Sequence, residues 1–275
     1  MIVFEKGFDF RTFHSTMKNL LLIFLFFSFS SGAQNSIEAT FIKKVKFNVE
    51  TLVGIDNFET FFFINNNTFY LKGDNKTITY SNVQLGSITS ANTFNPLKIN
   101  LFYKNFNTVI ILDNRLAEIF RIDFNKIQPY KNVTHISSGN DNTLWIFNQD
   151  SQQLEVFDYK TKSPRATTLP IQSEILDIAS NYNYCWLLTK DYLYLYSYFG
   201  SLISKIKNEG YTSLIESNEN IILQKENNLY FLEKNSDKIK KIETPELLIS
   251  RFLLTNETLY IYDDEYLHYY QLKTN

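Results

Sequence analysis

The residue types that most often carry chemistry are scarce in this chain and far apart. Its three histidines are His14, His135 and His268, and its one cysteine is Cys185. A zinc site needs His or Cys ligands at short spacings, such as His-Glu-x-x-His, and the sequence has none of them. Cys185 lies in the apolar run Tyr-Cys-Trp-Leu-Leu, which predicts a buried small side chain and not a catalytic thiol. We therefore expect no catalytic residue, no metal and no cofactor.

Carboxylates are the other groups that could act, as acid and base in glycoside cleavage or as calcium ligands. The densest acidic group, residues 263–265, fits a charged hairpin tip better than a calcium site. The sequence has no G-x-S-x-G elbow, no Gly-rich phosphate loop and no Ser-x-Asp-x-Gly-x-Thr-Trp turn of the sialidase kind. A ring-shaped fold can bring distant carboxylates together, so a paired-carboxylate site stays open. Four acids near predicted strand ends are expected to be solvated: Asp56, Asp113, Asp177 and Glu216.

One basic residue is a candidate for recognition. Only four arginines follow residue 33, and arginine is favoured at recognition surfaces. Arg115 follows Asp113-Asn114 at a predicted hairpin tip. We predict Arg115 and Asp113 as possible partner-binding residues, with an ordinary exposed turn as the alternative.

The candidate residues lie within a repeated sequence pattern, which predicts the fold that positions them. Six similar segments have one or two polar residues and then a strand-like apolar run, and successive starts are 48, 35, 41, 36 and 38 residues apart. After each segment comes a turn rich in Asn, Asp or Lys and a second apolar strand, which is hairpin chemistry. A period near 40 residues is typical of a four-stranded propeller blade. The segments begin at Glu59, Asn107, Asn142, Asn183, Glu219 and Glu257.

The two ends of the chain complement each other. The last repeat, from about Ile249, has only three predicted strands, and the segment from Ala39 offers a fourth. Pairing them would remove exposed strand edges. We therefore predict an all-β fold, a β-propeller of about six four-stranded blades, whose ring is closed by the strand near residues 41–47 pairing with residues 266–272. An antiparallel sandwich or two small barrels are the alternatives.

Residues 39–275 resemble, in architecture, six- and seven-bladed propellers of the broad NHL and WD40-like type. The Gly-His and Trp-Asp signatures of WD40 repeats are absent, so the resemblance implies the fold only. The run NPLKINLFYKNFNTVIILDNRLAEIF, from Asn95, also resembles uncharacterised exported propeller proteins of Gram-negative bacteria. That resemblance implies no known chemistry.

The N-terminal residues predict where the protein is located. Residues 17–33, MKNLLLIFLFFSFSSGA, have a lysine, a short apolar run and small residues at the end, as a secretory signal peptide does. We predict cleavage between Ala33 and Gln34, with residues 1–16 as an over-long gene start and residues 34–275 as the propeller domain. An uncleaved membrane anchor is the alternative, although the apolar run is short for a bilayer span. The residue usage indicates an AT-rich genome and, with this signal, a Gram-negative bacterium.

The charge balance after residue 33 limits the classes of partner that we expect. After residue 33 the chain has 24 basic and 27 acidic residues, which disfavours nucleic acid and anionic membrane surfaces. We predict an exported, non-enzymatic repeat protein of the periplasm or cell envelope, acting as a scaffold or protein-binding subunit of an envelope assembly. The alternative is a propeller hydrolase or lyase acting on carbohydrate or lactone substrates.

Overall fold

The computed structural model describes residues 36–273, and the extension, signal peptide and cleavage site predicted for residues 1–33 lie outside them. Almost all of the regular secondary structure in the described residues consists of strands. These are β1 (Ser36–Lys46), β2 (Thr51–Ile55), β3 (Phe61–Asn65), β4 (Thr68–Lys72), β5 (Thr77–Ser81), β6 (Ser90–Asn92), β7 (Ile99–Tyr103), β8 (Thr108–Leu112), β9 (Glu118–Asp123), β10 (Val133–Ser138), β11 (Thr143–Asn148), β12 (Gln153–Asp158), β13 (Ser163–Thr167), β14 (Ile175–Ser180), β15 (Tyr184–Thr189), β16 (Tyr192–Ser197), β17 (Leu202–Lys207), β18 (Ser213–Ser217), β19 (Asn220–Lys225), β20 (Asn228–Leu232), β21 (Ile239–Glu243), β22 (Arg251–Thr255), β23 (Thr258–Tyr262) and β24 (Tyr266–Leu272). Single turns of 3-10 helix are η1 (Val83–Leu85), η2 (Lys104–Phe106) and η3 (Phe124–Lys126).

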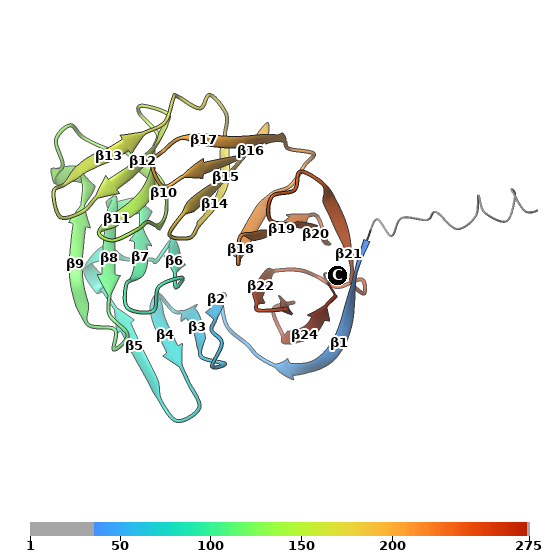
Figure 1. The fold of residues 1–275 in the computed structure, drawn as a ribbon. Coiled ribbons are helices and arrows are strands. Elements are labelled where there is room, and N and C mark those ends of the chain that lie inside the picture. Colours follow the sequence, from blue (N-terminus) through green and yellow to red (C-terminus); the bar gives the residue numbers. More distant parts are fainter. Residues whose placement is uncertain (1–35, 274–275) are drawn as a thin grey trace, which may run out of the picture. The chain divides into compact units, whose positions relative to one another are not determined.

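The strands form antiparallel sheets around a common centre. Four sheets have four strands each, β2–β5, β6–β9, β10–β13 and β14–β17, and the other eight strands form one sheet. The first strands β2, β6, β10, β14, β18 and β22 surround the centre of the ring (Figure 1). Neighbouring first strands contact one another around most of this ring. The all-β propeller prediction is confirmed.

The ring is closed by the strand that the sequence predicted. β1 pairs antiparallel with β24, from Ala39 opposite Leu272 to Lys46 opposite Tyr266. β1 also lies beside β21, so that β18–β21 and β22–β24 become a single sheet of eight strands with β1 between them. The number of sheets therefore differs from the predicted six blades, because the 11-residue β1 pairs along both of its edges and joins the last two four-strand units into one sheet.

One repeat was assigned to the wrong strand. Five of the six aligned segments form the second strand of a four-strand unit, whereas the segment from Asn107 forms β8, a third strand. The true second strand is β7, and both strands are five residues long and entirely buried, so their patterns look alike. Successive turns of an antiparallel sheet lie at opposite ends. The turn carrying Arg115 is therefore at the opposite end of the ring from the one implied by the alignment.

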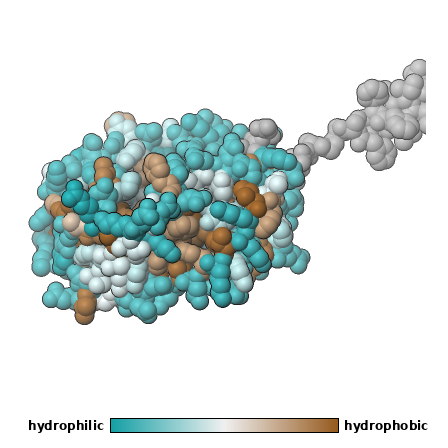
Figure 2. All heavy atoms as spheres, turned by 90° about the horizontal axis from the view of Figure 1, so that it is seen from below, coloured by the Kyte–Doolittle hydropathy of each residue, from teal (hydrophilic) through white to brown (hydrophobic). Residues whose placement is uncertain are grey.

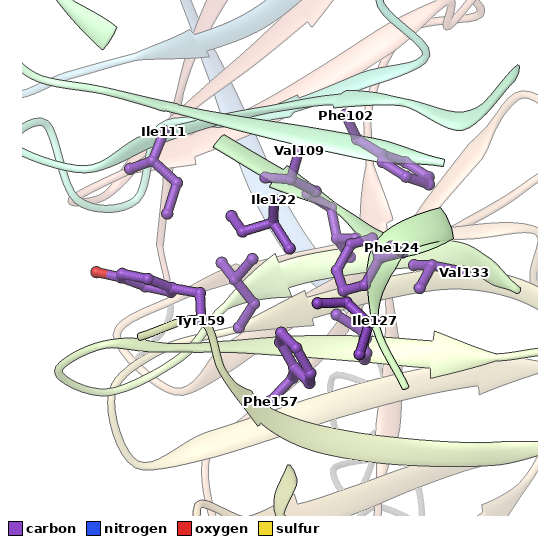
Figure 3. Packing of buried hydrophobic residues seen from close by; sticks show 12 residues of the cluster. Phe102, Val109, Ile111, Ile122, Phe124, Ile127, Val133, Phe157 and Tyr159 are labelled. Atoms are coloured by element: carbon purple, nitrogen blue, oxygen red, sulfur yellow. The ribbon is translucent and has the colours of Figure 1, made fainter. Parts of the chain in front are cut away.

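Hydrophobic clusters pack each four-strand unit against the next. Figure 3 shows the cluster between β6–β9 and β10–β13, where Phe102, Val109 and Ile122 face Val133 and Phe157. Aromatic and branched side chains suit this role because they bury a large area on a pleated surface. Similar clusters lie at the other unit boundaries, including the one inside the eight-stranded sheet.

One sequence prediction about the core is confirmed. Cys185 is fully buried, and burial raises the pKa of its thiol well above the usual value. Trp145 and Trp186 are buried as well, with 1% and 4% of their surfaces exposed. Within residues 36–273, no helix is long and apolar enough to cross a bilayer.

Buried polar side chains join three sheets close to the centre. Ser138 donates to Asn92 Oδ1 at 2.7 Å, Asn100 donates to Ser138 Oγ at 2.9 Å, and Ser180 donates to Ser137 Oγ at 2.7 Å. A buried polar group is costly unless it is hydrogen-bonded, so this network favours one relative position of β6, β10 and β14. It forms a rigid base beside the cavity described next.

Candidate functional site: the central cavity

A cavity of about 530 Å³ lies at one end of the ring, which we call the central cavity. It is formed by the last residues of β2, β6, β14, β18 and β22 and by the turns that follow them. Its size is in the range of sites that take a small molecule or an inserted side chain. Its lining residues are Val53, Gly54, Ile55, Asp56, Asn57, Phe58, Phe62, Ala91, Asn92, Thr93, Phe94, Pro96, Ile178, Ala179, Ser180, Leu214, Ile215, Glu216, Ser217, Asn218, Leu253, Leu254, Thr255 and Asn256.

Close approach between first strands shapes the wall of the cavity. A Cβ atom at Gly54 would lie 2.5 Å from Thr93 Oγ1, so only glycine allows β2 to come this near to the residue after β6. On the other side of β2, Thr255 Oγ1 donates to the carbonyl of Ile55 at 2.8 Å. Together these contacts hold the ends of three first strands in place.

Two carboxylates line the central cavity. Asp56 Oδ1 accepts from the amides of Phe58 and Thr60, both at 2.8 Å, and thereby shapes the turn after β2. Glu216 Oε1 accepts from the Glu219 amide at 2.8 Å and from Asn181 Nδ2 at 3.0 Å. Burial raises the pKa of Glu216 above its usual value, although these two hydrogen bonds oppose the shift.

A third acid, Asp177 on β14, is partly buried and does not line the cavity. Its two carboxylate oxygens accept from the amides of Ile178 and Leu214, at 2.8 and 2.9 Å, which joins β14 to β18. Burial raises the pKa of Asp177 to about 6. Asp177 and Glu216 are therefore less solvated than expected, because both are partly buried in the ring.

Exposed aromatic rings surround the opening of the central cavity. Phe58 and Phe94 line it and are 85% and 38% exposed. Tyr182, 44% exposed, packs edge-on against Phe94 with ring centroids 4.8 Å apart. Aromatic side chains that stay in water at a concave surface are typical of binding sites.

The predicted partner-binding residues lie at the same end of the ring but farther from its centre. Asp113 Oδ1 accepts from the amides of Arg115 and Ala117, both at 2.8 Å, so this carboxylate builds the turn between β8 and β9. Arg115 is exposed and forms no ion pair with any described residue. Neither residue lines the central cavity. Their role in partner binding stays a prediction.

Two other acidic or histidine sites have structural explanations. Asp263 accepts from the amides of Glu265 and Tyr266 at 3.0 and 2.6 Å, and its other oxygen is 2.8 Å from His268 Nε2. These bonds are those of a hairpin tip. Near the start of β10, at the other end of the ring, burial and, to a smaller extent, the nearby Lys104 together lower the pKa of His135 to about 4. No cluster of three or more His, Cys, Asp or Glu side chains occurs in the described part of the chain.

The sequence analysis missed the aromatic rings and did not join Asp56 to Glu216. The sequence feature that could have indicated these residues is their position, because each lies near the end of a first strand or just after it. They come from different repeats, so only the closed ring brings them to one cavity.

Comparison with solved structures supports the fold. The chain is similar to virginiamycin B lyase from Staphylococcus aureus, with 12% identity over 88% of this chain and 97% of that one and a TM-score of 0.57. It is similar to the Pan2 WD40 domain of Neurospora crassa, with 7% identity, 81% and 74% coverage and a TM-score of 0.55. A chain in a mitotic checkpoint complex matches with 13% identity, 85% and 96% coverage and a TM-score of 0.55. At these identities the likeness shows the propeller fold alone.

No protein family and no curated protein matches the chain in sequence.

Proposed function

We propose that this protein is a non-enzymatic binding module that holds a partner protein at the end of the ring where the central cavity opens. The observation that carries the proposal is the group of exposed aromatic side chains at this opening, Phe58, Phe94 and Tyr182. Large aromatic residues that fill pockets on a partner are the usual centres of protein interfaces. Turns on a rigid scaffold are also where recognition residues concentrate.

The side of the ring that Figure 2 shows is a weaker candidate for the binding surface. The surface in Figure 2 is mostly hydrophilic, with hydrophobic side chains in small, separate groups. Similar propellers are compatible with either reading, since one occurs in a mitotic checkpoint complex and another is a lyase. The turn-building hydrogen bonds of Asp56 favour binding over acid–base chemistry, because they occupy one oxygen of a carboxylate that a hydrolase would need.

The proposed setting is the cell envelope, and it rests on the predicted signal peptide. Mass spectrometry of the protein from its native host should find an N-terminus at Gln34. If the protein in the membrane fraction still contains residues 20–29, the predicted cleavage and export are wrong.

The binding proposal is tested by affinity purification from detergent-solubilised envelope. We expect wild type to recover a partner in stoichiometric amount, and Phe58→Ser/Phe94→Ser to lose it by about tenfold or more. Leu169→Ser is the matched control, because Leu169 is 85% exposed in the connection between β13 and β14, at the other end of the ring. Arg115→Glu then tests whether the interface extends outward over the β8–β9 turn.

Two results would overturn the proposal. One is equal loss of the partner in the Leu169 control and the aromatic variant. The other is recovery of the protein alone together with turnover in a screen of sugar and lactone substrates, which would support the hydrolase or lyase.

A further inference from the structure

We infer that the central cavity receives a cationic side chain, a lysine or an arginine, presented by the partner protein. The inference rests on the proposed function and gives the chemistry by which the site would recognise its partner. It is carried by the charge, hydrogen bonding and aromatic lining of the cavity.

The charge of the cavity has one sign. Asp56 and Glu216 are its charged lining residues, and no lysine or arginine lines it among the described residues. Neither acid forms an ion pair with a described residue. A carboxylate that is partly removed from water is stabilised by a nearby cation. A cationic ligand would supply what this chain does not.

The Glu216 carboxylate is already oriented for such a ligand. Its Oε1 atom accepts two hydrogen bonds, from the Glu219 amide and from Asn181, which fix the group against the wall. Its Oε2 atom accepts none from the described residues and is free to bind a donor. Hydrogen bonds between an ammonium or guanidinium group and a carboxylate are among the strongest in proteins.

The remainder of the lining suits the rest of a basic side chain. Phe58 and Phe94 present aromatic rings at the opening, and the face of an aromatic ring attracts a cation. Ile215 and Leu253 line the cavity too and can pack against the methylene stem, as apolar surfaces do with lysine and arginine.

A second cavity provides a contrast. It measures about 730 Å³ and is lined by residues of β15–β17, β19 and β20 and of the turn after β20. Charges of both signs line it, since Lys205 and Lys234 lie there together with Glu219, Glu233 and Asp237, and Glu219 pairs with Lys234 at 2.8 Å. Unlike the central cavity, it therefore does not present charge of a single sign to a ligand.

The test is an NMR titration of the purified ¹⁵N-labelled protein with acetyl-Gly-Gly-X-Gly-Gly-amide, where X is lysine, arginine, norleucine or glutamate. The reporter is the Asn181 side-chain amide, which donates to Glu216. We expect saturable shifts with lysine or arginine, and binding of norleucine about tenfold weaker or more, since a charged hydrogen bond is lost. Glu216→Gln should weaken the lysine peptide by a similar factor. Glu219→Gln should weaken it less, because Glu219 pairs with Lys234 and does not line the central cavity.

Several outcomes would overturn the inference. These are equal binding of the lysine and norleucine peptides by wild type, unchanged lysine binding by Glu216→Gln, and tighter binding of free spermidine than of the lysine peptide. If no peptide binds while the aromatic variant still loses its partner, this inference fails and the proposed function stands. If the aromatic variant keeps its partner, the proposed function fails independently. The wild-type comparison of peptides remains decisive even if Glu216→Gln does not fold.

Discussion

Two glutamates are removed from water in this ring, and the chain treats them differently. Glu155 on β12 is sealed in, with Lys131 Nζ 2.7 Å from Oε2 and Asn148 donating to Oε1 at 3.1 Å; the side chains of Lys131 and Glu155 are 5% and 3% exposed. Glu216 on β18 receives two neutral donors and no cation from the described residues. The difference is access. Buried Glu155 has its cation, Lys131, within the chain. Glu216 lines the cavity, and a cation from a ligand can reach it there.

The largest expected effect is at the sealed pair. Glu155→Gln leaves Lys131 charged and buried without a partner, so we expect the free energy of unfolding to fall by about 3–5 kcal/mol in urea denaturation. Glu219→Gln removes an ion pair whose lysine is half exposed, and it should cost about 0–1 kcal/mol. A loss below about 1 kcal/mol for Glu155→Gln would break the comparison, because it would mean that the buried charge does not require its partner.

The next effect concerns Asp177, a partly buried acid that is held by backbone amides. Its folded pKa of about 6 lies above the usual value of 3.8, so the folded state binds the proton more tightly than the unfolded state. Stability from this group is therefore present below pH 4 and is lost as pH rises towards 6. The unfolding free energy of Asp177→Asn relative to wild type should rise by about 2 kcal/mol between pH 4 and pH 7.

Measuring this as a difference between variant and wild type removes the contribution of His135. That histidine acts in the opposite direction, because its pKa is lowered to about 4 and its stabilisation is lost as pH falls below its usual value. A difference between Asp177→Asn and wild type that stays constant from pH 4 to pH 7 would show that Asp177 is not perturbed by burial.

The smallest effect is expected at the cavity itself. Glu216→Gln keeps an oxygen to accept from Glu219 and Asn181 and breaks no ion pair with a described residue. We expect the unfolding free energy at pH 7 to change by less than about 1 kcal/mol, because neutral donors can bond to an amide oxygen as well as to a carboxylate oxygen. A loss comparable to that of Glu155→Gln would show that Glu216 serves the fold and not a ligand.

Much of the fold could be predicted from the sequence because its signals are local. Alternating apolar residues and Asn- and Asp-rich turns indicated the strands, and the three-strand last repeat, completed by the segment from Ala39, indicated the pairing of β1 with β24. The error at β8 has a local cause as well. β6 has only three residues and no apolar run, so the repeat was aligned one strand too far along.

The candidate site could be predicted only in part, because it depends on distant residues. Asp56 and Glu216 were noticed as acids near strand ends, but nothing local shows that both line one cavity. Phe58 and Phe94 look like other aromatic residues until the ring leaves them in water. Arg115 was singled out for its residue type, and the structure places it at the same end of the ring, outside the cavity.

The most direct measurement of the central claim is the pKa of the Glu216 carboxyl group by NMR, without a peptide and with the lysine or the norleucine peptide. The account predicts a raised pKa in the free protein, a fall when the lysine peptide is bound, and no fall with norleucine, because only lysine brings a positive charge to the carboxylate. A Glu216 pKa that is unchanged by the lysine peptide, or changed equally by both peptides, would contradict the account.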